Sequence, residues 1–480
     1  MLEAQAHHRL KQLLRESGGS NWPHHLTLTR LVARSLRRGD HSLFPVSATA
    51  DRPWLLGLLL PVLMADYPVL IVASESLQRR LIKRELASLA AVGLQRPLWQ
   101  GESPPSNPGL WLVSAAELVE IWRRGELGDH QLIFAEAEEL EEQLRQAQAI
   151  RLLPQHWDQL ARAKPQLAHS LLHLHERLSR QLLNRPLGRR PNLAIAAEQE
   201  APLRLLVQGI EGLPEPWQSW QQSVGPDWTS WAITEPKLLQ WSLERQPLKP
   251  LASLNGLMLK RGAILIGALM PQGQRLQDLG LRKPVVVPLH TPERHEALPL
   301  YAPRLQAMPN SPFFSEQLLA QCRRLVLGQL ELSVVLVNDD QLRQWLTSAL
   351  AAEFGQRVDH EQTAPDSNGV VCCGWDWWLE HHEQLPQPGQ LIVGLLPIAS
   401  LEDPLTAARV NGLRQGGRDW FRELLLPEAI ERVQRGVAPL RTGKTSRLAV
   451  LDGRLRGRGW GQRVLDALEP WEPLERLLPA

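Results

Sequence analysis

One triplet, Gly443–Thr445, has the residue types of a phosphate-binding loop. Such a loop needs glycine-rich backbone whose N–H groups surround the phosphates, a Lys that reaches them, and a Ser or Thr for Mg²⁺. Ala438 stands five residues before Gly443, where the motif requires another Gly. The triplet also precedes an apolar segment, 447–451, whereas a phosphate loop follows a strand. We therefore interpret it as an ordinary loop.

The loop at 48–54 has the better position for phosphate chemistry. It lies between a strand predicted at His41–Ser47 and a buried helix predicted at Trp54–Met64. It contains no Lys, since the nearest one is Lys83, and Asp51 adds a negative charge where phosphates would lie. The sequence therefore predicts no ordinary tight ATP binding at this loop.

Two histidine groups have spacings that suit a metal. His169 and His173 are four residues apart on a predicted helix, which places both on one face. No acidic residue joins them before Glu176, so we interpret them as surface histidines. For the adjacent residues His381–Glu383 we favour hydrogen bonding between domains over a metal site.

Two arginine-rich segments and one tryptophan cluster have the chemistry of nucleic-acid contacts. They are Arg454, Arg456, Arg458 and Arg463 beside Trp460; Arg34, Arg37 and Arg38; and Trp375, Trp377 and Trp378. Guanidinium groups suit bidentate phosphate contacts, and an aromatic face that stacks on a base contributes ~1–3 kcal/mol. The alternatives are that the arginines are solvated surface charges and that the tryptophans fill a cleft between domains.

Composition indicates a large globular protein. The chain has 480 residues, 43% of them hydrophobic and 22% charged, so two or three domains are expected. A net charge of +2 gives no global field for nucleic acid, and any such binding must come from local patches. Three cysteines, Cys322, Cys372 and Cys373, are too few for a disulfide framework or a four-cysteine cluster. A reducing, cytoplasmic setting is expected.

Neither export nor membrane insertion is expected. The first 17 residues are amphipathic and charged, without the apolar core of a signal peptide. The apolar stretch Pro53–Ala73 is interrupted by Pro61, Asp66 and Pro68, so a buried helix followed by a buried strand is predicted.

Short apolar strands alternate with helical segments along most of the chain, which is typical of a parallel α/β sheet. In the first part they are His41–Ser47, Pro68–Ser74, Leu110–Ser114, Gln131–Phe134, Ala263–Ile266 and Pro284–Pro288. In the second part they are Leu332–Val337, Gly369–Cys373, Gln390–Gly394 and Arg447–Leu451.

The pattern predicts two tandem α/β domains of parallel sheets. The first occupies residues 1–150 and 251–305, and the second occupies residues 306–480. Residues 151–250, rich in His, Arg and then Trp, are predicted to form a helical, Trp-rich insert in the first domain.

Ordered segments along the chain resemble those of the DinG and XPD-like superfamily 2 DNA helicases. They are Leu59–Pro61 (LLP), Ile133–Glu138 at the DEAH position, Pro309–Phe313 (like SPF), Leu396–Pro397 with Asp403–Arg409 (like LPF…DPLVAAR), Leu426–Ile430 (like LPEAV) and Leu451–Leu455 (like LDPRL). The resemblance implies two RecA-like domains of the P-loop NTPase type and, in the family, ATP-dependent 5′-to-3′ unwinding from single-stranded DNA tails.

The departures from the family pattern fall on its ATP-handling positions. At the DEAH position Ala135 replaces the aspartate that holds Mg²⁺, Glu136 stands at the water-activating position, and Glu138 replaces the histidine. Ile266–Met270 stands where the family has TSATL, without its hydroxyls.

In the second domain the matches are partial. Leu379–Glu383 stands where the family has WEGVD, so that Glu380 is kept and Glu383 replaces Asp. In the arginine-finger segment only Gly436 is in place, and Arg441 is one residue out of register. No Cys precedes Cys322, so the iron–sulfur cluster of many family members is not expected.

The favoured hypothesis is a DinG-like helicase homologue that binds single-stranded DNA, or a repair or replication protein, with impaired or lost ATP hydrolysis. One alternative is an active helicase in which Arg52 replaces the P-loop Lys and Glu136 or Glu383 recruits Mg²⁺ for ATP. A second alternative is a protein-interaction scaffold without nucleic-acid affinity.

Overall fold

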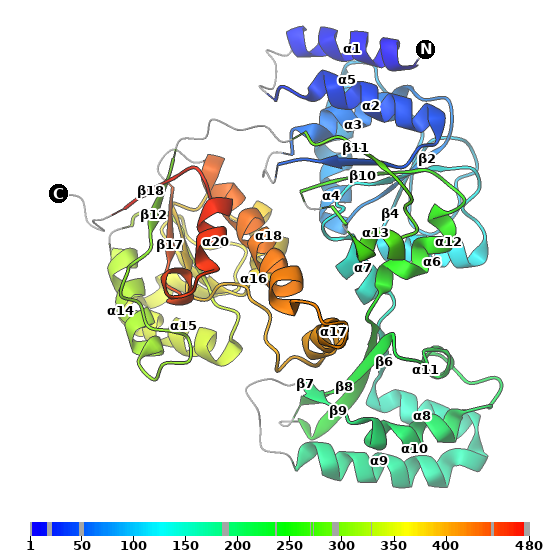
Figure 1. Ribbon diagram of the computed structural model, residues 1–480, viewed down its shortest axis with the longest axis vertical. Coiled ribbons are helices and arrows are strands. Elements are labelled where there is room, and N and C mark those ends of the chain that lie inside the picture. Colours follow the sequence, from blue (N-terminus) through cyan, green and yellow to red (C-terminus); the bar gives the residue numbers. More distant parts are fainter. Residues whose placement is uncertain are drawn as a thin grey trace.

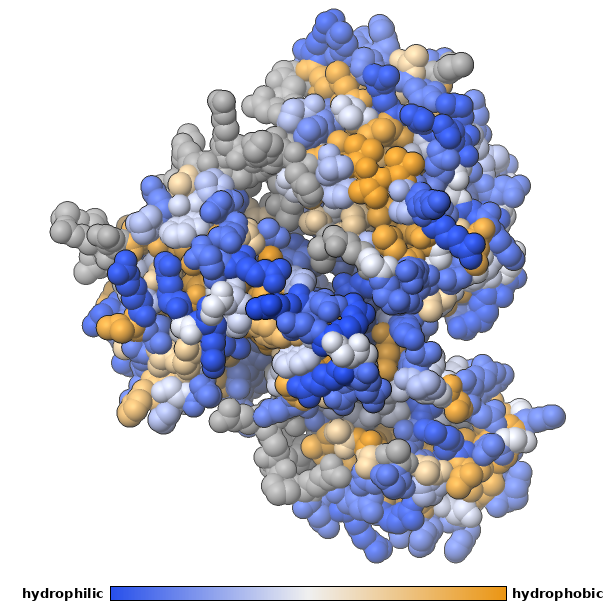
Figure 2. All heavy atoms as spheres, in the orientation of Figure 1, coloured by the Kyte–Doolittle hydropathy of each residue, from blue (hydrophilic) through white to orange (hydrophobic). Residues whose placement is uncertain are grey.

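The protein is described as a computed structural model that covers residues 2–16, 22–47, 52–184, 192–235, 238–268, 270–271, 273–289, 297–327, 329–442 and 446–474. Three lobes are visible: a first domain, a second domain and an insert that leaves and rejoins the first (Figure 1). Figure 2 shows the same lobes as a surface that is hydrophilic over most of this face. None of the described helices is long and apolar enough to cross a membrane.

The first domain is built on a parallel seven-stranded sheet. Its strands, in spatial order, are β11 (Val285–Val286), β1 (Ser42–Pro45), β10 (Ala263–Gly267), β5 (Gln131–Phe134), β2 (Val69–Val72), β4 (Leu110–Val113) and β3 (Leu98–Gln100). The central strands are buried, as expected of a parallel sheet with helices on both faces. The six strands predicted for this part are confirmed, and only the edge strand β3 was missed.

Helices cover both faces of this sheet. One face packs against α1 (Leu2–Glu16), α2 (His25–Arg38), α3 (Trp54–Met64) and α4 (Glu75–Arg80). The other packs against α6 (Ala115–Arg124), α7 (Leu140–Ala147) and α12 (Asn255–Met258). The apolar stretch Pro53–Ala73 thus forms buried α3 and buried β2, as predicted.

The second domain repeats this architecture. The strand order is β14 (Val358–His360), β15 (Val370–Cys373), β13 (Ser333–Leu336), β16 (Gln390–Val393), β17 (Arg447–Val450), β12 (Leu298–Tyr301) and β18 (Trp471–Pro473), all parallel. Helices α14 (Phe314–Leu327) and α15 (Asp340–Phe354) pack on one face, and α16 (Trp375–His381), α18 (Leu426–Val437) and α20 (Gly461–Ala467) on the other.

The second sheet begins before the boundary expected at residue 306. Strand β12 pairs with β17 and β18, so it belongs to the second domain. It was missed because Leu298–Tyr301 is short and contains Pro299, which weakens the strand signal.

The insert contains the expected helices and also a sheet that the sequence did not predict. It contains an antiparallel sheet of β6 (Ile150–Leu152), β9 (Gln240–Pro247), β8 (Trp228–Glu235) and β7 (Asn192–Ala194), packed on α8 (Pro154–Ala163), α9 (Ala168–Leu183), α10 (Ala197–Val207) and α11 (Trp217–Gln222). The tryptophans were the missed signal, since aromatic and β-branched residues favour half-buried strands. Trp231 and Trp241 are buried on β8 and β9.

Helix α17 (Pro404–Gln415) joins the second domain to the insert, because it packs against β8 and β7 (Figure 1). Asp403 caps its first turn, accepting hydrogen bonds from Thr406 N at 2.9 Å and from Thr406 Oγ1 at 2.8 Å. The second domain therefore contacts both the insert and, as described below, the first domain.

The close approach of β1 and β10 depends on Gly262. A Cβ atom there would lie 2.0 Å from Gly39 O and 3.0 Å from Asp40 N, which are backbone atoms that cannot move aside alone. We expect Gly262→Ala to lower the free energy of unfolding by about 1–3 kcal/mol, measured by denaturant titration. The matched control is Gly412→Ala in α17, where a Cβ meets nothing within 4 Å and Ala should leave stability equal or higher. Equal effects of the two substitutions would contradict this account.

Candidate functional site

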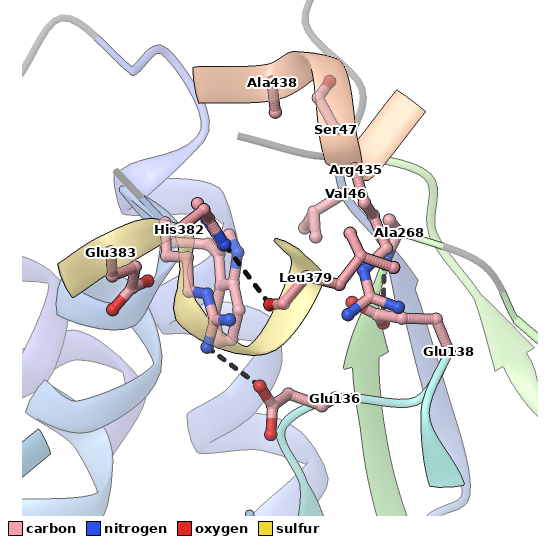
Figure 3. A pocket seen from close by; sticks show the side chains of 13 residues that line it. Val46, Ser47, Glu136, Glu138, Ala268, Leu379, His382, Glu383, Arg435 and Ala438 are labelled. Carbon is pink, nitrogen blue, oxygen red and sulfur yellow. Dashed lines mark hydrogen bonds and ion pairs between the residues drawn. The ribbon is translucent and has the colours of Figure 1, made fainter. Parts of the chain in front are cut away.

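A small cavity of about 60 Å³ lies between the two sheet domains. On the first domain its walls follow the carboxyl ends of β1, β5 and β10, where parallel sheets usually bind ligands. The second domain closes it with α16, the following turn and α18. The lining residues are Val46, Ser47, Arg52, Trp54, Glu136, Glu138, Gly267, Ala268, Leu379, His382, Glu383, Arg435 and Ala438 (Figure 3).

Glu136 is held by partners on both carboxylate oxygens. Its Oε1 accepts a hydrogen bond from the Arg52 guanidinium at 2.9 Å (Figure 3). Its Oε2 accepts one from the backbone N–H of Ser74 at 2.8 Å. Ser74 caps the start of α4 directly after β2, so the neighbouring strand supplies this donor. Because only 5% of the side chain is exposed, both bonds are shielded from water.

Arg52 is the cation of this cluster. Burial opposes its charge, but Glu136, Glu383 and Glu139 outweigh burial and raise its pKa, so the guanidinium stays charged. Its φ of 45° lies in the left-handed region that residues other than glycine rarely adopt. The backbone is therefore strained at Arg52, the residue that pairs with Glu136.

Glu138 faces Arg435 across the domain boundary. Its Oε2 accepts a hydrogen bond from Ala268 N at 3.0 Å, which fixes the carboxyl at the end of β10. Burial raises the pKa of Glu138 to about 8, against the opposing charge of Arg435 and with the repulsion of Glu139 and Glu136. At neutral pH this carboxyl is therefore mostly protonated.

The guanidinium of Arg435 is the second cation at the boundary between the two domains. It pairs with Glu139 of the first domain, and its other nitrogen pairs with Glu431 on its own helix at 3.1 Å. Sequence comparison with the family motif pointed instead to Arg441. Arg441 donates to the carbonyls of Leu468 and Pro470, away from the cavity. The signal that could have identified Arg435 is its place one turn after Glu431 on the same helix face.

The other second-domain candidates divide between the cavity and the core. Glu383 lines the cavity and pairs with Arg80 at 3.3 Å, whereas the Glu380 side chain is 74% exposed and points away. Gly436 serves packing, since a Cβ there would lie 2.6 Å from the ring of Trp375. Burial lowers the pKa of His382, which keeps that imidazole neutral.

A second group of ion pairs crosses the same boundary. Arg275 of α13 (Gln274–Asp278) contacts Glu428 at 2.8 Å and Glu141 at 3.0 Å, and Arg409 contacts the same two carboxylates at 2.6 and 3.5 Å. Burial opposes ionisation of Glu428, but Arg409 and Arg275 outweigh it and lower the pKa of Glu428. Arg409 and Glu428 lie in two of the segments that resemble the helicase family, where they act here as a bridge.

Some of the residues that were predicted to contact nucleic acid are instead buried or paired within the second domain. Trp378 is fully buried and donates its indole N–H to Gly436 O at 2.9 Å, so we withdraw it as a base-stacking residue. Trp377 is half-buried and stacks on His381 at 4.7 Å between centroids. Arg454 is held by Asp452 at 2.6 Å.

The other arginines of the same segment, Arg456, Arg458 and Arg463, remain on the surface. Arg456 lies over the ring of Trp471, 5.9 Å from its centroid, and Arg458 is exposed.

Among the residues that the structure describes, no group of three or more His, Cys, Asp or Glu could hold a metal ion. Residues 48–51, Leu269 and Gly443–Thr445 lie outside the described residues.

The described residues of the cavity do not fit Mg²⁺–ATP. Ala135 offers no carboxylate, and Glu136 and Arg52 satisfy each other. The cavity can hold a few water molecules between fixed charges.

Two tandem parallel sheets covered by helices, with a candidate site between them, define the class: tandem RecA-like helicase domains. Within that class the fold is that of the XPD helicases. An apo XPD structure superposes with a TM-score of 0.63 at 12% identity, covering 93% of this chain and 100% of that one. Xpd4 of S. tokodaii gives 0.62 at 11% identity, covering 90% and 96%.

Sequence similarity to curated proteins is distant and local. The chain is 37% identical over 82 residues to the ATP-dependent DNA helicase YoaA of Escherichia coli (strain K12), which is 17% of this chain and 13% of YoaA. It is 35% identical over 114 residues to the 3′-5′ exonuclease DinG of Bacillus subtilis (strain 168), covering 22% and 12%. The matches thus span less than a fifth of these relatives, and no family model matches the chain. The chain is thus distantly similar in sequence to YoaA and DinG, and its fold is similar to that of XPD.

The pKa of Glu138 predicts a specific pH dependence of stability. The folded pKa of about 8 lies above the ordinary 4.5, so the unfolded chain loses this proton first as pH rises, and stability falls between those values. Glu138→Gln keeps an acceptor for Ala268 N but cannot ionise. We expect its melting temperature to exceed that of the wild type by several degrees at pH 8 and by little at pH 5. Exposed Glu380→Gln is the control, and a constant offset across pH for Glu138→Gln would contradict the prediction.

The second ion-pair group predicts a measurable coupling. Arg409→Gln leaves Glu428 with Arg275 only, and because Glu428 is half-buried we expect a loss of about 1–3 kcal/mol in the free energy of unfolding. Adding Glu428→Gln should recover part of this loss. A double-mutant cycle by denaturant titration gives the coupling, and strictly additive effects would show that the pair contributes nothing.

Proposed function

We propose that this chain is a DinG/XPD-like helicase homologue that binds nucleic acid and has lost efficient ATP hydrolysis at the cleft between its RecA-like domains. The observation that carries the proposal is the ion pair between Arg52 and Glu136, with Ser74 N as the second partner of the carboxylate. Glu136 occupies the position where a helicase activates water, and here both of its oxygens are bonded to the protein.

The energetics of this pair support the proposal. A triphosphate would have to take Arg52 away from Glu136, and breaking a buried ion pair by removing one partner costs about 3–5 kcal/mol. Phosphoryl transfer also needs a bound metal to neutralise the developing charge, and Ala135 cannot coordinate one.

ATP turnover tests the proposal directly. We expect purified protein to show no turnover stimulated by single-stranded DNA above the level of Glu136→Gln, and no saturable binding of a fluorescent ATP analogue. Glu136→Gln is a close control because it keeps the shape of the side chain and one acceptor oxygen but cannot activate water.

Two outcomes would overturn this part of the proposal. Stimulated turnover that Glu136→Gln abolishes would make Glu136 a catalytic base. If Arg52→Ala also abolishes it, Arg52 replaces the P-loop lysine and the chain is an active helicase. The nucleic-acid part is tested separately by fluorescence anisotropy with a labelled single strand, where no salt-sensitive binding would indicate a protein-interaction scaffold.

A further inference from the structure

The first domain carries a band of cations at the amino ends of its strands, opposite the cavity. It comprises the exposed side chains Arg30, Arg34, Arg37, Arg38, Lys260, Arg282 and Lys283 and the half-buried Arg261. We call this band the basic edge. Helix α12, which precedes Lys260, lies on the side of the first domain that faces away from the second domain (Figure 1).

The parallel register brings these segments together. Ser42 of β1 pairs with Ile264 of β10 and with Val285 of β11. Three residues earlier on the three strands come Gly39, Arg261 and Arg282, and strand spacing is about 4.8 Å. The contact of Gly262 with Gly39 O shows that the segments before β1 and β10 remain adjacent.

Helix α2 extends the band along its exposed face. Arg30, Arg34, Arg37 and Arg38 recur at helical spacing, and the rise from Arg30 to Arg38 is about 12 Å, comparable to that of three or four successive phosphates on one strand. Gly39 ends the helix with a φ of 66°, and the chain then enters β1. The helix and the strand ends therefore form one continuous surface.

Cationic side chains outnumber their acidic partners on the basic edge. Within it, Arg37 pairs with Glu3 and Arg38 with Asp40, both at 2.8 Å. No ion pair with a described residue is found for Arg30, Arg34, Arg282 or Lys283, and the Lys260 ammonium lies 5.4 Å from the centroid of the Trp122 ring. Since the whole chain carries only +2, this concentration makes the basic edge a local anion-binding surface.

The neighbouring edge strand favours a nucleic acid over a peptide. The N–H groups of Val285, Val287 and Leu289 donate to β1, so Val286 and Pro288 face outward. A peptide added to this edge would need an N–H at position 288, which proline lacks. The cations are instead spaced along a helix and three strand ends. This arrangement suits contacts to backbone phosphates, which require no contacts to bases.

We propose that the basic edge binds the phosphate backbone of nucleic acid, as a surface separate from the cleft between the domains. The inference rests on the proposed nucleic-acid binding and assigns it a location. Binding there needs no ATP and no movement of the second domain. It is independent of sequence and weakens steeply with salt.

The test compares an edge variant with a control variant that loses the same number of positive charges. The edge variant combines Lys260→Gln, Arg261→Gln, Arg282→Gln and Lys283→Gln. A second variant, Arg30→Gln with Arg34→Gln, changes only exposed side chains of α2 and keeps the test valid if the edge variant folds poorly. The control removes four exposed arginines from the insert: Arg162, Arg177, Arg180 and Arg204, each changed to Gln.

Anisotropy with labelled single-stranded and duplex oligonucleotides gives affinity and its salt dependence. We expect the edge variant to bind at least tenfold more weakly at about 0.1 M salt, with a log–log salt slope shallower by about 2–3, and the α2 variant to lose about half as much. The insert control should bind nearly as the wild type does.

Each other outcome is decisive. Equal losses in the edge variant and the insert control, or none in the edge and α2 variants, would overturn the location while leaving nucleic-acid binding intact. No binding by the wild type would overturn the proposed function itself. Competition by polyglutamate as strong as that by an unlabelled oligonucleotide of equal charge would reassign the surface to an acidic peptide.

Discussion

The structure between the two domains depends on pairing buried carboxylates. Glu136, Glu138 and Glu139 follow β5 closely in sequence and point into one region, and an unpaired carboxylate there would be very costly. Arg52 and Ser74 N satisfy Glu136, Arg435 satisfies Glu139, and Glu138 takes up a proton instead. Because Arg435 comes from the second domain, this pairing also sets where that domain sits.

The second domain is therefore held at more than one place. Arg275 and Arg409 join Glu141 and Glu428 beside the cavity, and α17 packs on the sheet of the insert. In many two-domain enzymes a bound ligand draws the domains together. Here charged side chains of the two domains pair with each other across the cleft.

The arginine-rich segment predicted from the sequence and the basic edge seen in the structure show why residue type alone is a weak guide to nucleic-acid contacts. Arg454 and Trp378 have the right chemistry, but one is held by Asp452 and the other fills the core under α18. Lys260, Arg261, Arg282 and Lys283 attract little notice in the sequence because they occur as two separated pairs. The parallel sheet brings these pairs together at one edge.

Periodicity and residue type determined most of the fold: Val69–Val72 is a run of apolar residues, and in Gln390–Val393 the last three residues are apolar. Such runs are stable only when they are buried in a sheet. The sequence also named Glu136 and Arg52 as candidates for one nucleotide site, through their positions in the family pattern. It did not predict the sheet of the insert, the pairing of β12, or Arg435 as the partner of Glu139. These were decided only by tertiary structure, because the free energy of a long-range pair or a buried tryptophan depends on what lies opposite it in space.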